Sequence, residues 1–388
     1  MPRRATKRGA ERTPLTGRYD VVICGASFGG LAVARELRGT GARVLVVDRY
    51  EIGEKQTSAC AAPTTLLEHM GLEASIKQTF GRLVTHTPWQ RAVWPLPFRF
   101  STFDYRRLCE LLWEQCDGAE FETAKVDGRS GGERGEIVVH TDRGDLAAPL
   151  VVDALGWRRV LGTGPAVQPP DAALSRGLEV HPSGSGTDLE LWLDPRYISP
   201  GYSWSFAAGD EVRIGVGAYD PRVHVKQPTV SLARDTGHDA IRYQGNWIPH
   251  RLRPAAEDGV FFVGDSAGHC FPVTAEGIRP ALVFGIVCGR EIRAVLEGRQ
   301  TRADALRRYA ADSASHRHKW EAIYRGQQSI RHVHGPVLDF FVWLFRRRRV
   351  SHWGFQKYLD IVSPERALPA PPLASPRVPE RPRDAVAA

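Results

Sequence analysis

Residues Gly25 to Gly30 read GASFGG and follow a short apolar run from Tyr19 to Cys24. This spacing could support either of two chemistries. In a dinucleotide fingerprint, Gly25 makes the turn, Gly30 lets helix and strand approach, and Ser27 replaces the usual middle glycine. In a hydrolase elbow, the G-x-S-x-G pattern would make Ser27 a nucleophile. Both motifs lie on a strand, a sharp turn and a helix, so their surroundings must decide between them.

The elements around the motif favour nucleotide binding. The run GGLAVARELRGTG predicts a helix closed by glycines, and ARVLVVD predicts a second buried strand that ends at Asp48. In this βαβ unit Asp48 lies 23 positions after Gly25, where a ribose-binding acid is expected. A hydrolase would need oxyanion-hole amides from an earlier loop, and the 24 residues before Gly25 are mostly a basic tail. A purely structural βαβ turn remains an alternative.

The composition is that of an ordinary globular protein, with 388 residues of which 42% are apolar and 25% charged. The net charge of +8 is concentrated in residues 1–18 and 331–358, so it does not indicate a nucleic-acid partner. The six cysteines show no CxxC spacing and the thirteen histidines no complete ligand set, so we expect reduced thiols and no metal. With neither a signal peptide nor a run of about 18 apolar residues, we expect a cytoplasmic protein without membrane spans.

A second glycine-rich stretch lies far along the chain. Residues 260–285 read VFFVGDSAGHCFPVTAEGIRPALVFG, which predicts a buried strand, a Gly-Asp turn and an apolar helix. Together with the first motif, this pattern resembles the FAD-dependent oxidoreductases of the para-hydroxybenzoate hydroxylase superfamily. The resemblance implies that the first motif holds the ADP half of FAD and the second motif the other half. The cofactor-binding residues that it implies are Gly25, Ser27, Gly29, Gly30, Asp48, Arg49, Gly264, Asp265, Gly277 and Ile278.

Within this set, the resemblance assigns Asp265 to the ribityl chain and the backbone of Gly277 and Ile278 to the pyrimidine edge of the flavin. A reduced flavin carries negative charge at that edge, and helix N-termini favour anions. The resemblance also implies a flavin-contacting arginine near residues 105–107, for which we choose Arg106.

Cys60 gives a finer resemblance, to the geranylgeranyl reductase family. It matches a cysteine that lies close to the flavin ring in that family, although Ala61 and Ala62 stand where the family commonly has glycines. The resemblance implies a catalytic role for Cys60, in which it tunes the flavin potential or donates a proton. A small packing residue is the alternative.

The same family carries a Tyr-x-Trp-x-Phe pattern, which Tyr202, Trp204 and Phe206 match. Strand alternation would place the three rings on one face, where an aromatic wall would suit a long polyprenyl substrate. Core packing is the alternative, and the Pro and Lys that follow in the family are alanines here. The pair Leu155-Gly156 replaces the Asp-Gly of the aromatic hydroxylases, which favours the reductase, cyclase and halogenase branches.

Near the C-terminus, residues 333–358 set an aromatic, apolar run beside four consecutive arginines. This segment resembles an interfacial membrane anchor, with residues 337–355 as the contact and the inner face of the cell membrane as the surface. A helix packed on the domain with a solvated arginine run is the alternative.

We therefore expect an α/β protein with a discontinuous, Rossmann-like FAD-binding domain, a β-rich substrate domain and a helical C-terminal segment. The expected reaction is reduction of carbon–carbon double bonds in an isoprenoid group, with NAD(P)H or a ferredoxin-like donor as electron source. The alternatives are an FAD-dependent monooxygenase or halogenase-like enzyme acting on an aromatic or polyketide metabolite, and a non-enzymatic scaffold. The expected ranges are a basic disordered tail (1–18), the FAD-binding domain (19–75, 140–165 and 255–300), the substrate domain (80–135 and 166–250), a helical region (301–362) and a disordered Pro-rich tail (363–388).

Overall fold

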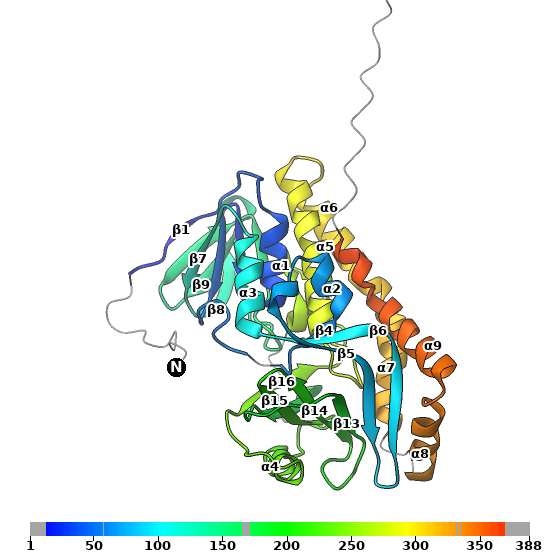
Figure 1. The fold of residues 1–388 in the computed structure, drawn as a ribbon. Coiled ribbons are helices and arrows are strands. Elements are labelled where there is room, and N and C mark those ends of the chain that lie inside the picture. The colour runs from blue at the N-terminus through cyan, green and yellow to red at the C-terminus, as the bar shows by residue number, and fades with distance from the viewer. Residues whose placement is uncertain (1–12, 57, 165–170, 331–332, 334, 369–388) are drawn as a thin grey trace, which may run out of the picture.

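The computed structural model describes residues 13–56, 58–164, 171–330, 333 and 335–368 (Figure 1). The expected fold class is confirmed, because a Rossmann-like α/β unit, a β-rich unit and a run of C-terminal helices follow one another in space. Most of the two tails predicted to be disordered, residues 1–12 and 369–388, lies outside the described residues.

A six-stranded sheet forms the centre of the cofactor side, in the order β17-β18-β11-β2-β3-β7. The pairs from β18 to β7 are parallel, and β17 is antiparallel to β18. Its inner strands are short Val-, Leu-, Ile- and Phe-rich runs that are buried on both faces, as parallel strands covered by helices are. The bounds are β2 Val21–Cys24, β3 Val44–Asp48, β7 Ala119–Thr123, β11 Leu150–Asp153, β17 Ala256–Glu257 and β18 Val260–Phe262.

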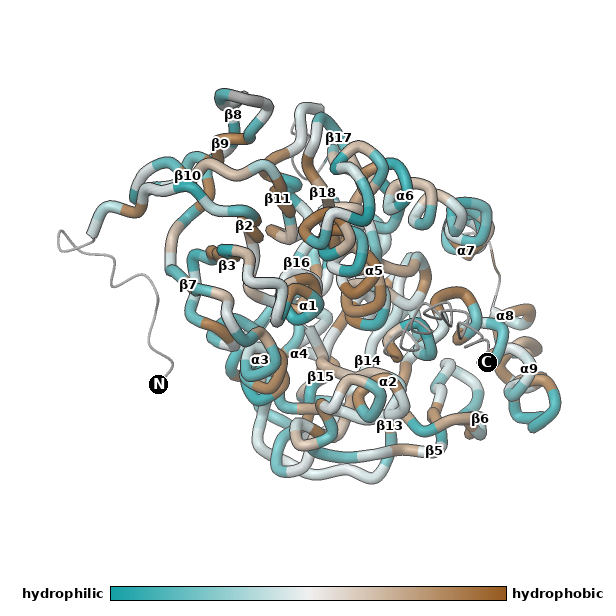
Figure 2. Tube along the Cα trace, turned by 90° about the horizontal axis from the view of Figure 1, so that it is seen from above, coloured by the Kyte–Doolittle hydropathy of each residue, from teal (hydrophilic) through white to brown (hydrophobic). Residues whose placement is uncertain are grey.

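Helices α1 (Phe28–Glu36) and α5 (Ile278–Leu296) pack against each other beside this sheet. They touch backbone to backbone, since a Cβ on Gly285 would lie 2.6 Å from the Gly29 carbonyl oxygen. Figure 2 shows α5 as a largely hydrophobic helix in the middle of the molecule. Helix α3 (Tyr105–Glu114) lies on the other side of α1, and Asp104 caps it by accepting a hydrogen bond from the N–H of Arg107.

An eight-stranded, mostly antiparallel sheet forms the substrate side, in the order β16-β12-β15-β14-β13-β5-β6-β4. One face of β15 packs on helix α4 (Lys226–Asp235), because Val212, Ile214 and Val216 form a cluster with Leu232. The other face of β14 and β15 is therefore left for the cofactor side. The bounds are β4 Ala61–Pro63, β5 Ile76–His86, β6 Arg91–Phe103, β12 Leu174–Val180, β13 Leu189–Trp192, β14 Gly201–Ala208, β15 Glu211–Ala218 and β16 Gln244–Pro249.

A four-stranded sheet, β1-β10-β9-β8, shares the core of the cofactor side. The strand pairing leads us to propose different domain ranges here. Strands β7 and β8 fall in the range 80–135, yet β7 pairs with β3 and β8 with β9, whereas β4 pairs with β6 of the eight-stranded sheet. Pairing partners far apart in the sequence decide this division, and we propose to move the boundaries accordingly. The bounds are β1 Gly17–Arg18, β8 Val126–Gly131, β9 Ile137–Thr141 and β10 Gly144–Ala148.

The prediction of disorder is wrong at two places inside the described residues. Gly17–Arg18 forms β1 and pairs with β10, and Leu15 before it is buried. Near the other end, residues 364–367 form a short 3₁₀ helix, in which Ala367 is buried. Each segment is ordered by contacts with distant parts of the chain, which the local sequence does not predict.

Four α-helices follow α5 in the described part of the chain. A capping box at Thr301 and Asp304 begins α6. In Figure 1, α7, α8 and α9 run along one side of the molecule, past the end of β5 and β6. The bounds are α6 Arg302–Ser315, α7 Arg317–Ile330, α8 Gly335–Leu344 and α9 Arg348–Leu359, with α2 Thr64–His69 earlier in the chain. Among the described helices, none has the length and the apolar character needed to cross a membrane.

Candidate functional site

The turn between β2 and α1 requires glycine at two of the predicted positions. Gly25 has a φ of 114°, and a Cβ there would lie 2.3 Å from the carbonyl oxygen of Ala154. A Cβ on Gly30 would lie 1.8 Å from the carbonyl oxygen of Gly25. Ser27 is the N-cap of α1 but makes no side-chain cap, so no side chain caps the first N–H groups of the helix. A helix start of this kind suits a phosphate group.

Asp48 lies against this turn at the end of β3. Its carboxylate accepts hydrogen bonds from the backbone N–H of Ala26 at 2.8 Å and of Tyr50 at 3.0 Å. Burial raises the pKa of Asp48, and the two backbone bonds oppose that effect. The neighbouring Arg49 is exposed, and its guanidinium lies 4.8 Å from the centre of the Tyr50 ring.

Tyr105, which the sequence analysis did not single out, reaches the fingerprint from α3. Its hydroxyl donates a hydrogen bond to Ser27 Oγ at 3.0 Å. The predicted Arg106 is the next residue and is exposed at the start of α3. The structure thus brings Tyr105 onto the first turn, and a cofactor role for Arg106 stays a prediction.

The second predicted turn lies directly beside the first. A Cβ on Gly29 would lie 2.8 Å from Val263 Cγ1 and 3.6 Å from the backbone nitrogen of Gly264. The carboxylate of Asp265 points toward the start of α5, because a Cβ on Gly277 would lie 3.5 Å from Asp265 Oδ1. Burial raises the pKa of Asp265 to about 6, an effect that Arg253 reduces.

Asp153, the last residue of β11, braces the second turn. Its carboxylate accepts hydrogen bonds from Ser266 Oγ at 2.7 Å and from the N–H groups of Leu155 and Leu161 at 2.9 and 2.8 Å. The Asp153 carboxylate therefore ties the loop after β11 to the turn that contains Ser266.

The three predicted aromatic residues lie on β14, as strand alternation requires. The rings of Tyr202 and Trp204 are 5.7 Å apart, whereas Phe206 packs on a separate cluster with Phe80 and Leu189. The Tyr202 hydroxyl donates to the carbonyl oxygen of Thr274 at 2.6 Å, so this strand touches the loop that precedes Gly277. Burial raises the pKa of Tyr202.

Glycines on the neighbouring strands make room for Trp204. Gly215 is its pairing partner on β15, and a Cβ there would lie 2.2 Å from Trp204 Cζ2. The indole N–H donates to Glu179 Oε2 at 3.2 Å, and the other carboxylate oxygen of Glu179 bonds His181 Nε2 at 2.9 Å. Both side chains are 4% exposed, so a buried acid and a hydrogen-bonded imidazole lie against the aromatic strand. The buried charges in the runs GLEVH and EVRIG were the available sequence signal, and we missed it.

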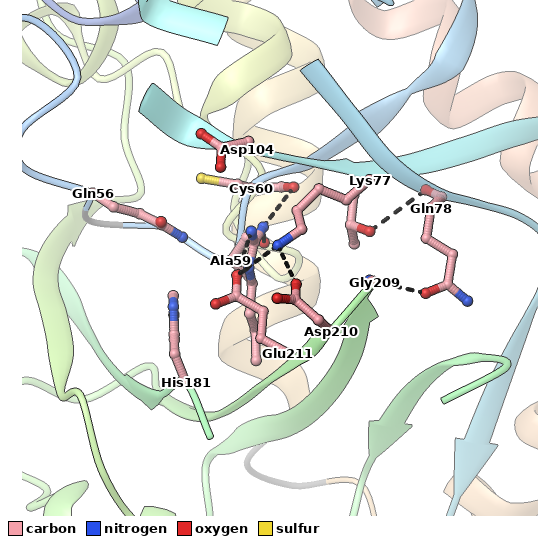
Figure 3. Close-up of polar contacts among 12 residues, drawn as sticks. Gln56, Ala59, Cys60, Lys77, Gln78, Asp104, His181, Gly209, Asp210 and Glu211 are labelled. Atoms are coloured by element: carbon pink, nitrogen blue, oxygen red, sulfur yellow. Dashed lines mark hydrogen bonds and ion pairs between the residues drawn. The ribbon is translucent and has the colours of Figure 1, made fainter. Parts of the chain in front are cut away.

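Cys60 lies between the two sides of the site (Figure 3). It is fully buried just before β4, and burial raises the pKa of its thiol well above the usual value, so the thiol is protonated at neutral pH. Cys60 interacts electrostatically with Glu179 of the aromatic face and with Tyr105 of the cofactor side. Cys60 therefore lies near residues of both sides.

The described residues contain no cluster of three or more His, Cys, Asp or Glu side chains that could hold a metal ion. The six cysteines are free and buried. Two cavities of about 190 and 100 Å³ lie between residues 250–256 and helices α6 and α7, and none of the predicted site residues lines them.

The arrangement fits an FAD molecule. Two helix starts without side-chain caps, those of α1 and α5, follow neighbouring turns, and glycine at positions 25 and 29 lets the first turn pack closely on the backbone of Ala154 and on Val263. The residues that would hold the cofactor come from both predicted segments.

Comparisons with known proteins agree with this geometry, although no family model matches the chain. The chain is 24% identical over 339 residues to digeranylgeranylglycerophospholipid reductase 1 of Methanopyrus kandleri, a match that covers 79% of this chain and 87% of the relative. Among solved structures, it is similar to a geranylgeranyl bacteriochlorophyll reductase-like protein from Thermoplasma acidophilum, with a TM-score of 0.77, 17% identity, and coverage of 91% of this chain and 98% of that one. A probable FAD-dependent monooxygenase from Pseudomonas aeruginosa is also similar, with a TM-score of 0.64, 19% identity, and coverage of 88% and 100%.

The structural neighbours have the fold of FAD-dependent oxidoreductases, and the sequence relatives carry the reductase name. These comparisons confirm the predicted resemblance of the chain to the geranylgeranyl reductase family, within the para-hydroxybenzoate hydroxylase superfamily of FAD-dependent oxidoreductases.

Proposed function

We propose that this chain is an FAD-dependent oxidoreductase that reduces carbon–carbon double bonds in an isoprenoid group. The observation that carries the proposal is the meeting of two glycine turns, at Gly29 and Gly264, together with the hydrogen bond from Tyr202 of the aromatic strand to Thr274 in the loop before Gly277. The reductase names of the sequence relatives support the choice of reaction.

In this proposal, different residues of the chain bind different parts of FAD. The turn from Gly25 to Gly30 and the start of α1 hold the pyrophosphate, and Asp48 takes the ribose hydroxyls. Asp265 binds the ribityl chain, and the backbone at Gly277 and the start of α5 face the pyrimidine edge. At this site a bound, reduced FAD would supply hydride chemistry for one carbon of the alkene.

The aromatic face of β14 would bind the isoprenoid chain. Tyr202 and Trp204 offer apolar area, which contributes about 25 cal/mol for each Å² removed from water. Their π faces also tolerate the partial positive charge that develops on an alkene carbon during protonation. The glycines beneath Trp204 keep that face flat, so the chain can lie along it.

Cys60 is the proton donor that we propose. Because burial keeps its thiol protonated, it can deliver a proton to the second alkene carbon and must then be reprotonated before the next cycle. The protein's remaining task is to orient the alkene and exclude water. The electron donor that we propose is NAD(P)H bound transiently or a ferredoxin-like protein.

A membrane surface is the second partner that we propose, and the α8 patch is its site. We define this patch as Trp89, Val337, Phe340, Phe341 and Trp343, whose exposed fractions run from 41% to 64%. The Phe340 ring lies 6.0 Å from the Phe341 ring and 5.8 Å from the Trp343 ring, and four exposed arginines follow at 346–349. Aromatic side chains beside cations suit an anionic lipid surface.

Sedimentation with vesicles of anionic phospholipid tests the membrane contact. We expect a double change of Phe340→Glu and Phe341→Glu to weaken vesicle binding about tenfold, because two rings that would enter the lipid are replaced by charges. Ile241→Glu is the matched control, since Ile241 is 47% exposed on another part of the fold. Equal binding by the double variant and the unchanged protein would rule out this surface.

Anaerobic incubation of the chemically reduced protein with polyprenyl lipids tests the reaction. We expect products heavier by the mass of two hydrogens and a large loss of rate in Cys60→Ala. A requirement for oxygen, with a hydroxylated or halogenated product, would instead support the monooxygenase or halogenase alternative.

A further inference from the structure

Arg213 on β15 is a buried cation with no part in the chemistry proposed above. Its side chain is 1% exposed, and Arg213 pairs directly with Phe206, so it lies on the aromatic face of the sheet. One of its nitrogens donates to the carbonyl oxygens of Ala59 at 2.7 Å and Cys60 at 3.2 Å. The two others bond Glu211 Oε1 at 3.1 and 2.8 Å.

Cys60 needs such support because its backbone is strained. Its φ of 52° lies in the left-handed region, which a residue with a Cβ rarely adopts. In the segment before it, the described residues 49–56 and 58–60 form no helix or strand. The Phe103 N–H donates to the Cys60 carbonyl oxygen at 3.0 Å, and Arg213 supplies the bonds from the substrate side.

The hairpin that carries Arg213 is itself tied to β5. Lys77 pairs with Asp210 at 2.8 Å, and the N–H of Gly209 donates to Gln78 Oε1 at 3.2 Å. Figure 3 shows Asp210 and Glu211 below Cys60, with Lys77 and Gln78 to the right of Cys60. The Arg213 guanidinium is therefore fixed with respect to the sheet. Through its hydrogen bonds to the carbonyl oxygens of Ala59 and Cys60, it also fixes the backbone of Cys60.

We infer that Arg213, held by Glu211, is a positioning residue that fixes the Cys60 thiol between the two sides of the site. A buried ion pair rarely contributes more stability than apolar packing would, whereas a planar guanidinium fixes two carbonyls and a carboxylate in one geometry. The role in catalysis rests on the proposed function, but the positioning itself does not.

Alkylation of the native protein with iodoacetamide, followed by peptide mass mapping, measures the positioning directly. In Arg213→Gln we expect the Cys60 labelling rate to rise about tenfold, since the segment can open locally, while the other five cysteines keep their rates. Glu211→Gln, which leaves Arg213 in place without its carboxylate, should give a smaller rise of about threefold.

Arg143→Gln is the matched control. Arg143 is also buried and also bonds a carboxylate and backbone carbonyls, namely Glu122 at 2.6 Å and those of Thr13 and Thr123, but it lies by the four-stranded sheet. We expect this variant to leave the Cys60 rate unchanged. An unchanged Cys60 rate in both Arg213→Gln and Glu211→Gln, or an equal rise at all six cysteines, would overturn the inference.

Turnover of a polyprenyl lipid separates this inference from the proposed function. With the function correct, Arg213→Gln should lower kcat about tenfold and leave KM nearly unchanged, because orientation of the donor and not substrate binding is lost. A loss that appears in KM alone would contradict a positioning role. If no form of the protein reduces the lipid but the Cys60 labelling changes as expected, the function fails and the positioning stands.

Discussion

Both sides of the site depend on glycine, yet their glycines touch different things. On the cofactor side, a Cβ on Gly30 would meet the carbonyl oxygen of Gly25 at 1.8 Å, and one on Gly285 would meet that of Gly29 at 2.6 Å. On the substrate side, a Cβ on Gly215 would meet the Trp204 ring at 2.2 Å. Backbone packed in a core cannot move aside, whereas a side chain can change its rotamer. Gly30 should therefore tolerate no added side chain, whereas Gly215 should tolerate one at the cost of binding geometry.

Gly30→Ala gives the largest effect on this comparison. Because the added methyl must displace backbone, we expect a loss of about 4 kcal/mol in the free energy of unfolding and no bound flavin. Thermal denaturation and the flavin absorbance of the purified protein measure both. Gly326→Ala is the control, since Gly326 has open space around it on α7, and we expect unchanged flavin binding there. A stable Gly30→Ala protein that still binds flavin would contradict the proposed difference between Gly30 and Gly215.

Gly215→Ala should have a smaller and different effect. The indole of Trp204 must tilt and give up its bond to Glu179, so we expect a loss of about 1–3 kcal/mol in stability, retained flavin and weaker binding of the isoprenoid. Gly217 on the same strand serves as control, because a Cβ there would lie 3.5 Å from Trp204 Cζ3, an ordinary contact. Loss of flavin in Gly215→Ala would show that the two sides are not separable.

The smallest effect that we predict concerns the charge of Asp265 on the cofactor side. Its folded pKa of about 6 lies above the usual 3.8, so the folded chain holds this proton more tightly than the unfolded chain does. The stability that it contributes is present below pH 3.8 and is lost as the pH rises through about 6. Asp265→Asn removes this dependence.

Urea unfolding of the FAD-free protein at several pH values measures the Asp265 effect. Between pH values of about 4 and 7, the unfolding free energy of the unchanged protein should fall relative to that of Asp265→Asn, because the folded chain holds this proton more tightly than the unfolded chain does. Parallel pH curves for the two proteins would mean that the folded pKa of this group is not raised.

The first βαβ unit was predictable because its signals are local. The apolar runs and glycines from Tyr19 to Asp48 predicted β2, α1 and β3, and the structure has them at those positions. The helix ends at Glu36, before the two glycines that were expected to close it. The strand with Tyr202 and Trp204 was likewise visible from its alternation.

The parts that the sequence did not reveal depend on contacts between distant residues. Arg213 bonds Cys60 across 153 positions of the sequence. Strand β7 pairs with β3 although the segment from β4 to α3 lies between them in the sequence. Tyr105 meets Ser27 only because α3 packs beside α1. No local propensity encodes such pairings, so the domain ranges and the supporting residues of the site had to come from the structure.

A crystal structure of the chain purified with FAD tests the central claim most directly. The account predicts a single FAD, with its adenine half near Asp48 and its ring system bounded by Cys60, Tyr202 and Gly277. A protein that takes up no FAD, or a flavin bound away from the junction of Gly29 and Gly264, would contradict it.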